Sequence, residues 1–161
     1  RFSEGWQVYQ QLNRQLREFP RATPQFARVS ALTVGTLLAI HQYAEAKDDV
    51  WLKRIRLLAA QMRRERIPFA LMLADFYEGL MLLHLGHRGG SKQVMSQCKE
   101  LLRSARTQAQ QQHLEPYVLA VDDALVEAEQ GESPSLLGSR MLKHGVVSPK
   151  RFRRLYTVPL R

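Results

Sequence analysis

Basic side chains in the segment 49–66 have types and spacing suited to anion binding. Four cations lie opposite the apolar stripe of this segment: Lys53, Arg56, Arg63 and Arg64. The run 63–66 contains one acid, Glu65, against three cations, which leaves a local positive field that attracts carboxylates or phosphates. The interpretation that we favour for this basic stripe is a solvated helix face, because Lys and Arg are good helix formers and commonly occupy exposed positions. The functional alternative is an anion-binding groove for acidic segments of a partner.

A second basic cluster lies near the C-terminus, where Ser148 and Pro149 predict a helix start followed by four cations. These cations are Lys150, Arg151, Arg153 and Arg154. Three interpretations fit the segment: it contacts nucleic-acid phosphates, it docks on an anionic membrane surface, or it packs against the acidic centre of the chain. The acids available for such packing are Asp122, Asp123, Glu127 and Glu129.

The run 145–155 also resembles a helix of the helix-turn-helix domain in AraC-type transcription activators. The resemblance implies DNA binding by this segment. The match covers one helix rather than a complete DNA-binding domain.

Residues typical of catalysis or metal binding are scattered. His84 and His87 lie three residues apart but have no nearby cysteine or matched carboxylate, so no metal site is expected. Cys98 falls on an apolar helix stripe, which predicts a buried core residue rather than a nucleophile. Asp75 and Glu78 are the only acids in the most apolar helix, and we expect them at a solvated edge or paired with a neighbouring arginine. The sequence predicts no enzyme activity and no cofactor.

The length and composition of the chain limit the classes of protein to which it can belong. The chain has 161 residues, 24 Lys and Arg against 15 Asp and Glu, a formal net charge of +9 and 45% hydrophobic residues. This length is typical of one domain, and this balance excludes a disordered chain. A single cysteine excludes an internal disulfide and indicates a reducing compartment, so we expect a cytoplasmic protein.

Helical patterns run along the whole chain, whereas the alternation typical of strands is nearly absent. Prolines open several of the patterns and glycines close them. The segment 68–86 is apolar on nearly all sides but contains Asp75 and Glu78, which favours a buried helix over a membrane span. The predicted helices cover about 3–19, 24–47, 49–66, 68–86, 90–112, 115–130, 134–144 and 148–156.

The starts of these helices suggest a repeat. Helix pairs begin near Pro24, Pro68 and Pro116, and such helical hairpins stack because none buries its apolar face alone. The predicted fold is all-α, with seven to eight helices in stacked antiparallel hairpins, either an α-solenoid or an irregular helical bundle. We expect a helical-repeat domain over 1–132 and a basic helical segment over 133–161 that packs on it or extends from it.

The middle hairpin carries a pattern of small and large residues at fixed positions. It has Gly79, Leu82 and Gly86 on its first helix, then Ser91, Met95 and Cys98 on its second. This order resembles the tetratricopeptide repeat over about 69–131. Arg103 replaces the closing proline of the motif, and the helices are long, as in the degenerate repeats of bacterial regulatory and signalling proteins. The resemblance implies protein binding on a concave helical surface.

Charge is segregated along the chain. Residues 1–67 have 12 basic and 6 acidic side chains, residues 68–132 have 5 and 9, and residues 133–161 have 7 and none. The two ends are thus basic and the centre is acidic, which favours oriented docking onto an acidic protein or onto a second copy of the chain. We therefore expect a non-enzymatic protein-interaction domain. The alternative is a nucleic-acid-binding domain of a transcription regulator.

Overall fold

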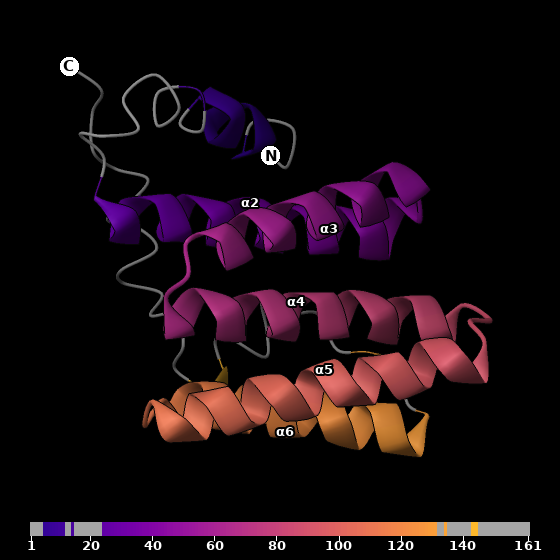
Figure 1. Ribbon diagram of the computed structural model, residues 1–161. Helices are drawn as coiled ribbons and strands as arrows, with labels where there is room; N and C mark the ends of the chain where they lie inside the picture. The colour runs from indigo at the N-terminus through magenta and orange to yellow at the C-terminus, as the bar shows by residue number, and fades with distance from the viewer. Residues whose placement is uncertain (1–4, 12–13, 15–23, 132–133, 135–142, 145–161) are drawn as a thin grey trace.

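The computed structural model describes residues 5–11, 14, 24–131, 134 and 143–144, and every regular element among them is helical. Residues 5–11 form a short N-terminal helical segment. The longer helices are α2 (Gln25–Ala46), α3 (Asp49–Arg64), α4 (Pro68–His87), α5 (Lys92–Gln111) and α6 (Glu115–Gln130), shown in Figure 1. The all-α prediction is therefore confirmed for the described part of the chain.

The helix count is lower than predicted. Six helical segments are described, against an expected seven to eight. The helix expected over 148–156 and most of that over 134–144 lie outside the described residues, as does the predicted domain boundary between residues 132 and 133.

Local sequence explains where the helices begin and end. The Asp48 side chain accepts a hydrogen bond from the Val50 N–H at 2.9 Å and so caps α3. Ser91 caps α5 in the same way through Val94. Pro68 opens the first turn of α4, where a missing N–H does no harm. Gly131 ends α6 in the left-handed conformation with φ 69°, as its position in the sequence predicted.

The helices pack as a layered stack. Short turns make α2 and α3 one antiparallel hairpin and α4 and α5 a second, and α6 packs on α5. The alternate helices α2 and α4 also touch, as do α4 and α6, so α4 lies at the centre of the stack (Figure 1). No comparable contact joins α3 to α5 within the described residues. The outer sides of α3 and α5 are therefore available to solvent.

Helix α4 forms most of the core. It is the one described helix that is long and apolar enough to cross a membrane by length and composition, and most of its apolar window is buried inside the stack. The prediction that this segment is a buried helix is confirmed. Two glycines let α5 approach it closely: a Cβ at Gly79 would overlap Leu102, and one at Gly86 would overlap Met95.

The N-terminal helical segment covers the α2–α3 hairpin at one end of the stack. Tyr9 is 4% exposed and lies over Gly35, where a Cβ would overlap its ring. Trp6 meets Trp51 edge to face, with ring centroids 5.0 Å apart. These aromatic side chains pack in the core or against a neighbouring helix.

Candidate functional site

The four predicted anion-binding residues of α3 do not share one environment. Arg63 faces α4, where its guanidinium contacts Asp75 at 2.8 Å and Glu78 at 2.6 Å. Partial burial acts to lower the pKa of Arg63, but the hydrogen bonds it donates to both carboxylates raise that pKa above its ordinary value. Arg63 therefore joins α3 to α4 through salt bridges. The other three predicted cations do not share this environment.

Asp75 extends this network of ion pairs to a third helix, α5. Its second oxygen accepts hydrogen bonds from Ser104 at 2.8 Å and from Gln108 at 2.9 Å, both on α5. The Asp75 carboxylate on α4 thus has three partners, Arg63 on α3 and Ser104 and Gln108 on α5, and so joins the three helices. The prediction that Asp75 and Glu78 pair with a neighbouring arginine is confirmed, because Arg63 contacts both carboxylates.

Three acids of α6 also form ion pairs with neighbouring cations. Asp122 accepts hydrogen bonds from Arg106 of α5, and Glu129 lies 4.0 Å from Arg103. Asp123 contacts Lys143 at 2.9 Å and His144 at 2.6 Å. Partial burial pushes the pKa of Asp123 up, but the bonds from Lys143 and His144 outweigh it and hold this pKa below its ordinary value. Asp122, Asp123 and Glu129 of the acidic centre are thus each matched by a neighbouring cation.

The contact at Asp123 also places part of the basic C-terminal segment. Lys143 and His144 lie against α6. The helix expected from Ser148 onward lies outside the described residues, so its packing against the acidic centre stays a prediction. The four cations predicted to form its binding surface lie outside the described residues: Lys150, Arg151, Arg153 and Arg154.

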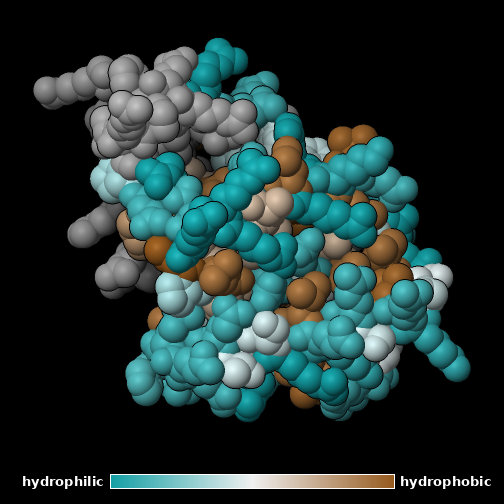
Figure 2. Space-filling view, viewed as in Figure 1, coloured by the Kyte–Doolittle hydropathy of each residue, from teal (hydrophilic) through white to brown (hydrophobic). Residues whose placement is uncertain are grey.

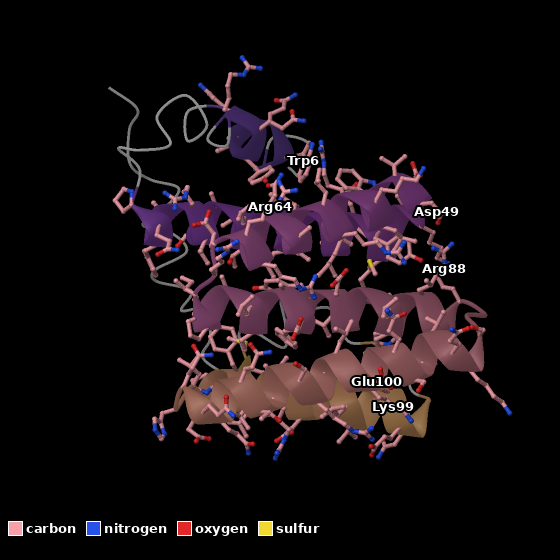
Figure 3. All side chains as sticks on the ribbon, viewed as in Figure 1. Trp6, Asp49, Arg64, Arg88, Lys99 and Glu100 are labelled. Carbon is pink, nitrogen blue, oxygen red and sulfur yellow. The ribbon has the colours of Figure 1, made fainter. Side chains whose placement is uncertain are left out.

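The outer side of α3 presents the remaining three predicted residues. Lys53, Arg56 and Arg64 are all exposed, and none forms an ion pair with any residue that the structure describes. Two apolar side chains lie among them, Val50 at 63% exposure and Leu57 at 49%. We call these five residues the α3 face. Figure 3 marks Arg64 on this helix, and Figure 2 shows hydrophobic side chains gathered over α3 and α4, whereas α5 is mostly hydrophilic on this side.

Sequence reasoning missed the apolar part of the α3 face. Val50, Leu57 and Arg64 are seven residues apart, so they follow one line along the helix, and Val50 and Leu57 stand about 10 Å apart. The seven-residue spacing of these side chains, outside the buried apolar stripe, is the sequence signal that could have identified this face. The arrangement can hold a segment with two apolar side chains at the same separation and acidic side chains beside them.

Cys98 lies away from any surface. Its side chain is fully buried, its Sγ donates to the Gly79 carbonyl oxygen at 3.2 Å, and burial raises the pKa of its thiol to about 11. The prediction that Cys98 is a buried core residue is confirmed. Over the described ranges, no three His, Cys, Asp or Glu side chains gather to hold a metal ion.

Comparison with known proteins finds no family model, no curated protein and no solved structure that matches the chain.

Proposed function

We propose that this chain is a non-enzymatic interaction domain that binds an acidic segment of a partner protein through the α3 face. The observation that carries the proposal is the contrast in charge pairing. Arg28, Arg63 and Arg106 each meet a carboxylate of the fold, whereas Lys53, Arg56 and Arg64 have none among the described residues. Unmatched cations beside exposed apolar side chains are typical of surfaces that contact another protein.

The two kinds of side chain on the α3 face have different roles. Leu57 and Val50 supply the apolar area that gives affinity when water is removed from it. Lys53, Arg56 and Arg64 surround this area, where charges mainly speed encounter and select acidic partners. An amphipathic helix with leucines seven residues apart and flanking glutamates has the matching chemistry.

The stack supports an arrangement of helical repeats behind this surface. Alternate helices begin at residues 25, 68 and 115, so the hairpin period is 43 to 47 residues. Contact between α2 and α4, and between α4 and α6, is what successive repeat units require. We propose a tetratricopeptide-like solenoid with α3 and α5 on one side, of the kind found in cytoplasmic bacterial regulators.

A designed peptide tests the proposal. The probe is a helical peptide with two leucines seven residues apart and four flanking glutamates, and its control replaces the glutamates with glutamine. We expect saturable binding of the glutamate peptide by fluorescence anisotropy and at least about tenfold weaker binding of the glutamine peptide, a difference of about 1.4 kcal/mol.

Matched charge reversals locate the binding surface. K53E/R64E changes the α3 face, whereas K92E/K99E makes the same change in charge on α5. We expect K53E/R64E to abolish peptide binding and K92E/K99E to change it less than twofold, apart from a general loss of attraction that high salt removes. Equal loss in both variants would show that net charge alone attracts the peptide, and the proposal would then be wrong.

Nucleic acid is the alternative partner, supported by the acid-free segment 133–161 with its seven cations. In that case DNA or RNA should bind with an affinity that falls steeply with salt, and K150Q/R151Q/R153Q/R154Q should weaken it. Binding that survives this quadruple change but is lost in K53E/R64E would assign nucleic acid to the α3 face instead.

A further inference from the structure

A small cavity lies between the N-terminal part of the chain and α3. Its volume is about 240 Å³, and its lining comes from Tyr9, Gln10 and Arg14 on one side and from α3 on the other. It opens beside the α3 face and shares only Leu57 with it. The cavity is therefore a separate candidate site, formed only when the N-terminal segment packs on α3.

The floor of this cavity is apolar and fixed. Tyr9 and Leu58 are 4% and 3% exposed, and Leu57 completes the apolar lining. The ring of Tyr9 rests on Gly35, where there is no room for a Cβ, so α2 supports the floor from below. A site with buried aromatic and aliphatic side chains favours a ligand with an apolar body.

The remaining lining is positively charged and rich in hydrogen-bond donors. Arg54 lies with its guanidinium carbon 5.2 Å from the centre of the Trp6 ring, a contact that positions the group and leaves its charge in place. Figure 3 shows Trp6 between the N-terminal helical segment and α3. Arg14, Gln10 and Gln61 complete the lining. Neither arginine forms an ion pair with a carboxylate of the described part of the chain.

We propose that this cavity binds a small organic carboxylate with a short apolar body. Two guanidinium groups suit a carboxylate because their planar donors match its two oxygens. The volume of about 240 Å³ is sufficient for a short-chain acid. A fully polar anion such as phosphate would leave the apolar floor without a partner.

Binding of hexanoate tests this proposal on the full chain by two-dimensional NMR. We expect saturable shifts of the backbone amides of Gln10, Leu57 and Gln61, and none with hexanamide, which has the same apolar chain without the charge. Inorganic phosphate should bind at least about tenfold more weakly than hexanoate, because it gains nothing from the apolar floor.

Two variants test whether the arginines that line the cavity are the cations that bind hexanoate. R54Q and R14Q should each weaken hexanoate binding about tenfold, the effect of one charge-assisted hydrogen-bonding group. R14Q keeps the packing of Trp6 on Arg54, so a loss in R14Q does not reflect a detached N-terminal segment. R56Q removes an equal charge two residues from Arg54 and should leave binding unchanged.

Three results would overturn the proposal: no saturable shift at millimolar hexanoate, equal binding of hexanamide, or equal losses in R14Q and R56Q. The peptide experiment depends on Lys53 and Arg64, whereas this one depends on Arg14 and Arg54, so failure of either proposal leaves the other standing.

Discussion

Arg63 and Arg64 are neighbours in the chain, and they belong to two regions of α3 with opposite electrostatics. The inner region, toward α2 and α4, has its cations and acids matched: Arg63 meets Asp75 and Glu78, and Arg28 of α2 meets Glu65 at 2.7 Å. The outer region, the α3 face, has cations with no matching acid in the described chain. Adjacent helix positions point about 100° apart, so one step along the sequence moves a side chain from the interior of the fold to its surface.

This difference indicates which region stabilises the fold and which is available for binding. The fold loses stability when one partner of a matched, partly buried ion pair is removed, because the other charge is then left desolvated and unpaired. Unmatched exposed charges contribute little to folding. Matched variants on the inner and outer sides of α3 separate these two roles by measurement.

Apolar truncation should show the largest difference. Ile55 is fully buried on the inner side of α3, whereas Leu57 is 49% exposed on the α3 face. I55A should lower the free energy of unfolding by roughly 2 to 4 kcal/mol, through lost burial and the cavity it creates. L57A should change it by less than about 0.5 kcal/mol. Urea denaturation followed by circular dichroism measures both. Similar losses would show that Leu57 packs in the core.

Neutralising the neighbouring arginines is the direct test of the charge comparison. R63Q should cost about 1 to 2 kcal/mol, less than a fully buried pair, because the Arg63 side chain is 35% exposed and water screens part of the interaction. R64Q should lie within about 0.5 kcal/mol of the wild type. The same denaturation experiment compares them. A cost for R64Q as large as that for R63Q would remove the distinction between the regions.

Acid should weaken the inner region selectively. The hydrogen bond from Arg28 is the main cause that lowers the pKa of Glu65 from 4.5, against an opposing effect of burial. Because this pKa is depressed in the folded state, the stability it contributes is present above pH 4.5 and is lost as the pH falls through the lowered value.

The variants E65Q and R28Q test that acid dependence. Both should flatten the fall in melting temperature below about pH 4.5, since either change removes the pair. An unchanged pH profile in both variants would show that Glu65 does not contribute to acid stability.

The smallest effect concerns repulsion within the α3 face. Lys53 and Arg56 are three residues apart on one helix, so their like charges are neighbours. R56Q should raise the free energy of unfolding by about 0.2 to 0.5 kcal/mol at low salt, and the gain should disappear at high salt. A loss of stability at low salt would mean that Arg56 has a stabilising partner and does not belong to an open binding surface.

Much of the fold follows from local sequence. Pro68, Ser91 and Gly131 mark helix ends through their own backbone and side-chain chemistry, so the five longer helices could be predicted to within a few residues. Cys98 and the buried character of α4 follow equally from helical periodicity. These features depend on residues within one helix or one turn, which is why a single sequence is sufficient to find them.

The candidate sites depend on contacts between distant segments and were only partly predictable. Lys53, Arg56, Arg63 and Arg64 look equivalent in the sequence, and only the position of α4 shows that Arg63 is used by the fold. Val50 and Leu57 were overlooked because apolar residues are normally assigned to the core. The cavity between Arg14 and Arg54 requires the N-terminal segment to pack on α3, and no local pattern indicates that packing.

Because the chain has a single cysteine, the rate of its chemical labelling measures how often the core of this protein opens. The Cys98 thiol lies between α4 and α5 and has a pKa of about 11, so in the closed state a thiol-reactive dye has neither access nor a thiolate to attack. Labelling at neutral pH therefore occurs only when this hairpin separates. The labelling rate reports how often that local opening happens, and slower labelling on addition of a ligand would reveal binding even where no helix changes its position.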